Sequence, residues 1–317
     1  MAVIGIDLGG TKISSALFRA NGEMEGFRKV LLQNKKGKEV GELIRAQLCS
    51  LIHESGTGTD PVTSVGVSVP GIFDRNTGKV WVPNIEGWKD YPLMDELAEA
   101  VEGEPVTVSI ADDRSCYILG ETWKGKAKDC KNAIFLAVGT GICAGILIDG
   151  KVLHGAGGIA GSIGWLALNK PYEEKYIPCG CNEYYASGEG LTRYAGEVMA
   201  SRPGYAGIFL QEEVSAYNLI REYGNKDGIA VEVIHNAIEY WGMTVANLVS
   251  IFNPEKIVFG GGVFGEAVRF LDQIYAEAKK WGQPVAMEQV TLEASETGAM
   301  AGLYGAAYLA MNPKGSA

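Results

Sequence analysis

Residues 3–18 of the chain read VIGIDLGGTKISSALF. The apolar, β-branched run before residues 7–12 and the alternating run after them predict two strands joined by a Gly-rich turn. Gly9 and Gly10 let the backbone turn with its N–H groups exposed, so an anion can be held there. Asp7, at the end of the first strand, suits Mg²⁺, which takes one or two carboxylates beside phosphate oxygens. A phosphate and Mg²⁺ turn and an ordinary tight turn with a solvated Asp7 both remain open at this point.

Length and charge narrow the class of protein. At 317 residues the chain exceeds one typical compact core, so two domains are expected. The 38 acidic and 28 basic residues give a formal net charge of −10, and the basic run at 35–38 is short, which argues against nucleic acid as a partner. No apolar stretch could span a bilayer, and the N-terminus shows no signal-peptide pattern. We therefore expect no membrane partner, a cytoplasmic location and six reduced cysteines.

Strand and helix patterns alternate along the chain, which favours α/β layers. After the opening hairpin, strands are expected at 27–32, 62–69, 105–110, 132–138, 145–149 and 257–259, and helices at 37–53, 93–101, 115–123, 184–200, 230–252 and 298–311. Residues 74–88 are rich in turn signals, and such loops commonly carry binding residues.

A second Gly-rich turn follows the strand at 132–138. Residues 139–144 fit the dinucleotide pattern G-x-G-x-x-A, but a strand and a turn come next, where that fingerprint requires a helix. We interpret Gly139, Thr140 and Gly141 as a second phosphate hairpin that echoes the first, and hence as a candidate internal duplication. No G-x-x-x-x-G-K-[ST] motif occurs, which argues against a P-loop fold.

Six motifs together resemble the ROK family of sugar kinases and repressors, within the actin/hexokinase/Hsp70 ATPase superfamily. They are DLGGTK at 7–12, Asp113 with GE at 120–121, GTG at 139–141, GCNE at 180–183 with SG at 187–188, NP at 253–254 with GGG at 260–262, and AGLYGA at 301–306. They occur in the family's order over nearly the whole chain. The resemblance implies an α/β, two-domain actin-like ATPase (ribonuclease H-like) fold with mixed sheets flanked by helices and a central cleft. Domains are expected at 1–120 and 121–297, with a helix at about 298–317 packing back on the first.

The same resemblance implies an ATP-dependent sugar kinase that phosphorylates a hydroxyl, expected to be the 6-OH, of a hexose or hexose derivative. Mg²⁺ would lie near Asp7, and Asp113 would be the catalytic base, which suits phosphoryl transfer. The alternative for Asp113 is a helix N-cap, a role that fits Asp112 better. The residues implied for ATP are Gly9, Gly10, Thr11 and Lys12 in one hairpin, Gly139, Thr140 and Gly141 in the other, and Gly260, Gly261 and Gly262 beside the adenosine.

The sugar side departs from the family pattern. Asp112 stands where the family has Asn, and the Glu-x-Gly-His motif reads Ser162-Ile163-Gly164-Trp165. Asp112 would suit a ligand with extra donors, such as an amino group, and Trp165 a flatter or less hydroxylated one. Trp165 would stack on a sugar face or fill the space of a lost metal site. The remaining implied sugar ligands are Glu183, Asn84 and the backbone of Gly71.

The family's structural zinc is predicted to be absent. Its ligands are the His of the same motif and three cysteines. Here Trp165, Glu174 and Tyr176 occupy three of the four positions, and only Cys181 matches. Structural zinc takes four ligands, usually Cys and His, so we expect none here and interpret Cys179 and Cys181 as plain thiols.

The residues leave two other functions to consider, a repressor and a sugar-binding sensor. A repressor is disfavoured because the first strand begins at Val3 and the charge is acidic. A catalytically weakened ROK-type sugar-binding sensor or regulator without a DNA-binding domain is the more serious alternative, because Asp112, Ser162 and Trp165 replace familiar sugar contacts. The sequence does not select the sugar, a homodimer is expected from the family alone, and His53, His154 and His235 are given no site role.

Overall fold

The computed structural model describes residues 1–55 and 60–312. The chain divides into two compact units. The first comprises Met1–Asp129, Gly145–Ala160 and the C-terminal segment from Met300, and the second comprises Cys130–Ala144 and Gly161–Ala299. The expected division into domains at 1–120 and 121–297 stays a prediction. No helix within the described residues is long and apolar enough to cross a membrane.

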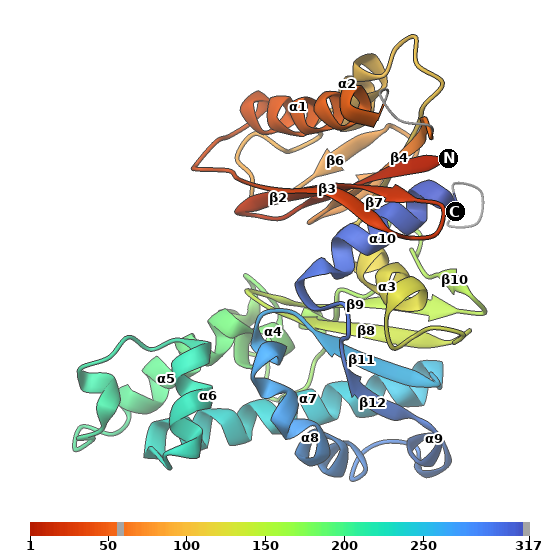
Figure 1. Cartoon of the computed structure of the whole chain (residues 1–317). Helices are drawn as coiled ribbons and strands as arrows, with labels where there is room; N and C mark the ends of the chain where they lie inside the picture. Colours follow the sequence, from red (N-terminus) through yellow and green to blue (C-terminus); the bar gives the residue numbers. More distant parts are fainter. Residues whose placement is uncertain (56–59, 313–317) are drawn as a thin grey trace. The chain divides into compact units, whose positions relative to one another are not determined.

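The first unit is built on a mixed five-stranded sheet in the order β3-β2-β1-β4-β7 (Figure 1). The strands are β1 (Ala2–Leu8), β2 (Lys12–Arg19), β3 (Met24–Leu31), β4 (Val62–Val69) and β7 (Thr107–Asp112). The opening hairpin β1-β2 is antiparallel, as predicted, and β3 pairs antiparallel with β2. The pairs β1-β4 and β4-β7 are parallel. The carboxyl ends of β1 and β7, which carry Asp7 and Asp112, therefore lie at the same edge of the sheet.

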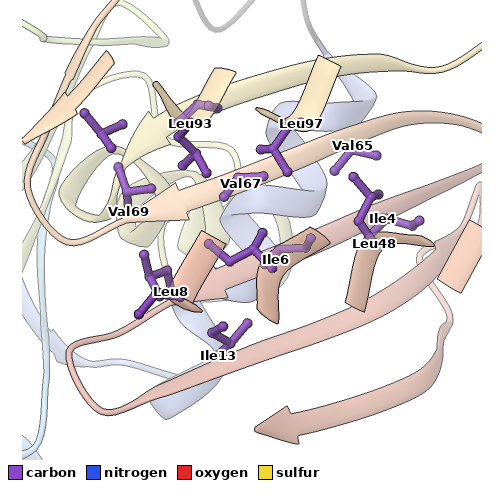
Figure 2. Close-up of a cluster of buried hydrophobic side chains, with 14 of the residues drawn as sticks. Ile4, Ile6, Leu8, Ile13, Leu48, Val65, Val67, Val69, Leu93 and Leu97 are labelled. Atoms are coloured by element: carbon purple, nitrogen blue, oxygen red, sulfur yellow. The ribbon is translucent and has the colours of Figure 1, made fainter. Parts of the chain in front are cut away.

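Helices cover both faces of this sheet. On one face, α1 (Lys38–Ser55) and α2 (Leu93–Ala100) enclose a core that includes Ile4, Ile6, Val67, Leu48 and Leu97 (Figure 2). On the other face, α10 (Ala301–Met311) packs its Leu303 and Ala307 against Val3 and Phe18. Burial on both faces explains why the central strands read as nearly continuous apolar runs.

Glycines allow α10 to approach the sheet closely. A Cβ atom at Gly66 of β4 would lie 1.8 Å from the carbonyl oxygen of Ala306, and one at Gly5 of β1 would lie 2.9 Å from that of Leu303. α3 (Asp113–Lys124) meets the same helix, because a Cβ at Gly305 would lie 1.8 Å from the carbonyl oxygen of Cys116. The backbone of α10 thus fixes the positions of β1, β4 and α3 relative to one another.

The segment at 74–88 contains more regular structure than its turn signals indicate. β5 (Ile72–Asp74) and β6 (Lys79–Trp81) form a two-stranded antiparallel sheet. The backbone of Val80 also pairs with that of Tyr91. Two three-residue strands separated by four residues are too short to show a periodicity that could be recognised in the sequence.

The second unit contains parallel strands β8 (Ala133–Val138), β11 (Lys256–Gly260) and β12 (Thr291–Ala294). They belong to a sheet in the order β10-β9-β8-β11-β12. β9 (Ile142–Ile148) begins in the second unit and ends in the first, where it pairs with β10 (Lys151–Val152). The helices of this unit are α4 (Cys181–Ala186), α5 (Gly188–Ala200), α6 (Ala216–Gly224), α7 (Gly228–Phe252), α8 (Leu271–Ala278) and α9 (Pro284–Gln289).

Several expected elements differ from the structure. The single helix expected at 184–200 is two helices, α4 and α5, because Ser187 is extended and its hydroxyl accepts a hydrogen bond from Gly190 N at 3.0 Å as the N-cap of α5. The expected strand at 145–149 begins earlier, at Ile142, and the helix at 298–311 opens with a 3₁₀ turn at Gly298–Met300. Helices α6, α8 and α9 were not predicted.

The close approach of α10 makes a stability prediction. Gly66→Ala places a methyl group against the backbone of Ala306, so we expect it to destabilise the protein by about 1–3 kcal/mol or more through overpacking. Gly196→Ala is the matched control, because Gly196 lies in α5 and a Cβ there meets nothing within 4 Å. Helix propensity predicts a gain of about 0.5–1 kcal/mol for the control. Thermal unfolding of both variants measures the difference, and an unchanged midpoint for Gly66→Ala would contradict the packing argument.

Candidate active site

Asp7 is the penultimate residue of β1, beside the Gly-rich turn in which Gly9 N donates to Lys12 O at 2.8 Å. α10 leaves room for the Asp7 carboxylate, because a Cβ at Gly302 would lie 2.4 Å from Asp7 Oδ1. Desolvation raises the pKa of Asp7. A positive ligand would relieve that cost, and carboxylate oxygens are the donors that Mg²⁺ prefers. The described residues contain no group of three or more His, Cys, Asp or Glu side chains placed to hold a metal, so Mg²⁺ here would need phosphate and water oxygens as its further ligands.

Asp112 and Asp113 stand where β7 passes into α3. Asp112 is the N-cap, as predicted: its Oδ1 accepts from Ser115 N at 3.1 Å and its Oδ2 from Ser115 Oγ at 2.7 Å. Asp113 begins the helix and accepts from its neighbour Arg114 N at 2.9 Å and from Tyr117 Oη at 3.3 Å. Desolvation, together with the negative charge of Asp112, raises the pKa of Asp113 to about 7. A carboxyl group with this pKa exchanges protons readily near neutral pH.

Arg114 is a buried residue for which the sequence suggested no role. Its Nε donates to Asp112 Oδ1 at 3.1 Å, and its Nη2 donates to Gly158 O at 3.0 Å and to Gly71 O at 3.4 Å. The side chain is 9% exposed. One guanidinium thus joins Asp112, Gly71 and the segment around Gly158. An arginine directly after the expected base was visible in the sequence, but its partners were not.

His154 also lies beside Asp112, although the sequence assigned it no site role. Its Nε2 is 2.7 Å from Arg75 Nη2, and its Nδ1 is 3.4 Å from Ser115 Oγ and 4.0 Å from Asp112 Oδ2. Because a guanidinium only donates, Nε2 is the acceptor and the ring proton belongs on Nδ1, facing Ser115 and Asp112. No local motif marks such a contact, since it joins residues far apart in the chain.

A cavity of about 760 Å³ in the first unit brings Gly10 and Thr11 of the turn together with Asn84. The other lining residues are Leu31, Leu32, Gln33, Asn34, Lys35, Lys36, Ile85 and Glu86. The turn and the segment before α1 are joined directly, because Leu32 N donates to Thr11 O at 2.9 Å. The structure therefore places a predicted ATP turn and a predicted sugar ligand on one cavity of one unit.

The second unit has a cavity of about 590 Å³ that brings Gly139, Thr140 and Gly262 together. Gly188 N donates to Gly139 O at 2.7 Å, which holds the start of α5 against the second Gly-rich turn. Gly261 has φ of +87°, and a Cβ there would lie 2.4 Å from Val138 O, so glycine is required. The sequence missed the other lining residues, which are Gly188, Glu189, Thr192, Arg193, Ser215, Ala216, Tyr217, Ile220, Val263 and Glu266, because most lie on helices whose ends or existence it did not predict.

Glu183 of α4 is tied to the second hairpin. Its Oε2 accepts from Ile142 N at 2.8 Å, and desolvation raises its pKa. A Cβ at Gly141 would lie 2.7 Å from that oxygen, and one at Gly164 would lie 3.0 Å from it. Glu183, Gly141 and the 162–165 segment are therefore neighbours in the second unit, where Trp165 exposes 60% of its surface. Ser162 is also exposed.

An aromatic cluster occupies the segment that carries the family's zinc motif. Lys175 Nζ lies 5.6, 5.2 and 5.3 Å from the ring centroids of Tyr176, Tyr184 and Tyr185, and 3.1 Å from Glu173 Oε2. The rings of Tyr184 and Tyr185 meet edge to face at 5.1 Å. A lysine ammonium thus supplies the positive centre of this cluster. Zinc absence stays a prediction; Cys181 is buried, and Cys179 Sγ lies 3.9 Å from Arg193 Nη1.

Comparison with known proteins gives a family and a fold. Residues 3–312 match the ROK family. A glucokinase from Halalkalibacterium halodurans is 28% identical over 99% of this chain and 96% of that protein. The crystal structure of a ROK hexokinase from Thermus thermophilus is 29% identical and covers 99% of both chains with a TM-score of 0.82. A ROK family glucokinase from Streptomyces griseus, solved with glucose and AMPPNP, is 28% identical and covers 98% of this chain and 100% of that chain with a TM-score of 0.77. These similarities confirm the predicted actin-like ATPase fold.

The Lys175 cluster makes a prediction about stability and metal. Lys175→Met removes the ammonium from three rings and from Glu173, so we expect the protein to lose about 0.5–2 kcal/mol of stability. Lys170→Met, on an exposed lysine of the same segment, is the control and should change the melting temperature little.

The predicted absence of zinc is tested separately. Treatment of the unmodified protein with a chelator should leave its melting temperature unchanged, and stoichiometric zinc by elemental analysis would contradict the predicted absence.

Proposed function

The chain belongs to the ROK family, and from this membership we propose that it is an ATP-dependent sugar kinase that phosphorylates a hexose or hexose derivative. The observation that carries the proposal is Asp113, a carboxyl group at the start of α3 whose pKa is raised to about 7. Phosphoryl transfer to an alcohol needs a group that accepts the hydroxyl proton, and otherwise depends on positioning and on neutralisation of phosphate charge.

On the ATP side, the 590 Å³ cavity of the second unit takes the nucleotide. Gly139, Thr140 and Gly141 hold phosphate oxygens, and Gly260, Gly261 and Gly262 border the adenosine. This assignment is supported by the AMPPNP complex of the Streptomyces griseus glucokinase, a relative over nearly the whole chain. The cavity wall includes Arg193 and Thr192, whose donors suit phosphate or ribose oxygens.

The first unit contributes its own phosphate turn. Gly9, Gly10, Thr11 and Lys12 bind phosphate oxygens through backbone N–H groups and the lysine charge. Asp7 would hold Mg²⁺ together with phosphate and water oxygens, and the ion would supply neutralisation of the phosphate charge.

In the reaction, ionised Asp113 takes the proton from the attacking hydroxyl, which we assign to the 6-OH, as that oxygen attacks the γ-phosphorus in line. The bond from the γ-phosphorus to the β–γ bridging oxygen breaks, and ADP leaves. Asn84, the Gly71 backbone and Asp112 on the first unit, and Ser162, Trp165 and Glu183 on the second, are the proposed sugar residues. Tyr117 Oη and Arg114 N fix the orientation of the Asp113 carboxylate. We also propose a cytoplasmic location and, from the family resemblance alone, a homodimer; the net charge of −10 argues against a nucleic-acid partner, and no membrane partner is proposed.

A second candidate function is a catalytically weakened sugar sensor. Ser162 and Trp165 favour it, because a hydroxyl and an indole replace a carboxylate and an imidazole at a sugar-contacting motif. The raised pKa of Asp113 favours the kinase, since a sensor has no need for a base with a pKa near 7.

The kinase proposal predicts a pH profile. Asp113 works only when ionised, so kcat/KM should fall about tenfold per pH unit below a midpoint near pH 7. Asp113→Asn should lower turnover by about 10²–10⁴-fold and leave ATP affinity unchanged, as measured by ADP release and by calorimetric titration of ATP.

Stability gives the control for this variant. Because the folded-state pKa of Asp113 lies above the ordinary value of 3.8, the native protein loses stability as pH rises from about 4 to about 7. Asp113→Asn removes this loss, so it should melt at a higher temperature than the unmodified protein at pH 8. Normal turnover in this variant would rule out Asp113 as the base.

The nucleotide cavity predicts a selective loss of ATP binding. A Cβ at Gly262 meets nothing within 4 Å and Gly262 lines the cavity, so Gly262→Leu should fit the fold but occupy the nucleotide's space and raise the KM for ATP at least tenfold. Gly265→Leu is the matched control, because Gly265 is equally open but does not line this cavity. Equal KM values for the two variants would place the nucleotide elsewhere.

A further inference from the structure

Arg114 occupies the acceptor groups that the first unit would offer to a sugar. Asp112 and the Gly71 backbone, whose acceptor is the carbonyl oxygen, are two of the proposed sugar contacts on this unit. Arg114 Nε bonds Asp112 Oδ1 at 3.1 Å, and Arg114 Nη2 lies 3.4 Å from Gly71 O. Ser115 Oγ donates a hydrogen bond to the other oxygen, Asp112 Oδ2, at 2.7 Å. Both contacts are therefore already engaged by donors of the protein itself.

His154 and Arg75 add further contacts beside Asp112. His154 places its Nδ1 4.0 Å from Asp112 Oδ2, and Arg75 holds the far side of the ring through a 2.7 Å contact with Nε2. Arg114 Nη2 also binds Gly158 O at 3.0 Å, which anchors the chain segment that carries His154. Asp112 thus has donors of Arg114, Ser115 and His154 around it, and its negative charge is balanced by Arg114. An amino group on a ligand, which an open Asp112 would have suited, must compete with Arg114 and Ser115 for these oxygens.

This arrangement matters because of how hydroxyl groups bind. Each sugar hydroxyl carries a proton that needs an acceptor, and burying a hydroxyl without one weakens binding. A site that has bound up its acceptors penalises a fully hydroxylated sugar and accepts one in which those hydroxyls are missing or substituted. In the second unit, Trp165 presents an indole that is 60% exposed, a surface that suits an apolar group.

We propose that Arg114 is a specificity-determining residue: by engaging Asp112 and the Gly71 carbonyl, it turns the kinase away from glucose and towards a hexose derivative that is deoxygenated or substituted on the ring. The inference rests on the proposed sugar-kinase function and names the substrate class of that site. Arg114 does not touch the reacting atoms, so its effect appears as a change in the ratio of affinities for two sugars.

The test compares sugar binding with and without the arginine. The double variant Asp112→Asn/Arg114→Ala removes both members of the buried ion pair, so no unpaired charge is left in the interior. Glucose, 2-deoxyglucose, 3-deoxyglucose and 3-O-methylglucose are titrated calorimetrically in the absence of ATP, and kcat/KM is then measured for each. Asp112→Asn/Arg114→Met keeps more side-chain volume and replaces the first variant if that one does not fold. Glu25→Gln/Arg19→Ala removes an ion pair elsewhere in the same unit and is the control.

The unmodified protein should bind at least one deoxy or methyl sugar at least tenfold more tightly than glucose. The double variant should shift that affinity ratio at least tenfold towards glucose, and the control should leave it unchanged. A parallel loss of affinity for all four sugars would show a merely structural role and overturn the inference, as would a preference for glucose in the unmodified protein. Binding is measured without ATP, so the two proposals are tested separately. Absence of turnover in every combination of variant and sugar would overturn the kinase function, and the affinity ratio would still test the role of Arg114.

Discussion

The contact of α10 with β1, β4 and α3 is the constraint on which the first unit depends. At Gly5, Gly66 and Gly305, backbone atoms of one element occupy the space that a side chain would need on another. Gly302 of the same helix makes room for the Asp7 carboxylate. Because close-packed backbones resist sliding, the ends of β1 and β7 keep a fixed separation. The Gly-rich turn after β1 and the Asp112–Asp113 pair are thereby held in one fixed arrangement.

That rigidity sets the electrostatics of the site. Asp112 and Asp113 are adjacent carboxyl groups in different environments. Asp112 accepts hydrogen bonds from Arg114 Nε and from Ser115 N at the N-terminus of α3. Asp113 is desolvated and lies beside the negative charge of Asp112, and these two effects raise its pKa to about 7. One carboxylate is fixed in place, and the other is left able to exchange a proton.

In the second unit, a lysine and several aromatic rings support the helix that contacts the second Gly-rich turn. Lys175, three tyrosine rings and Glu173 pack together beside α4, the helix that carries Glu183. Glu183 in turn holds the first residue of β9 through its bond to Ile142 N. The Lys175 ammonium is held by aromatic rings and needs no cysteine or histidine ligand. Through α4 and Glu183, this cluster is connected to the second Gly-rich turn.

Local periodicity, glycine spacing and capping chemistry were enough to predict the two Gly-rich hairpins, the α/β class and the N-cap at Asp112. They predicted one continuous helix over 184–200, because the break at Ser187 depends on an N-cap that competes with a continuous helical pattern. The contacts around Asp112 needed the folded chain. Arg114 is only two residues from Asp112, but its bond to Gly158 O spans 44 positions and the contact of Ser115 with His154 spans 39. No local pattern encodes which distant segments will pack around a buried carboxylate.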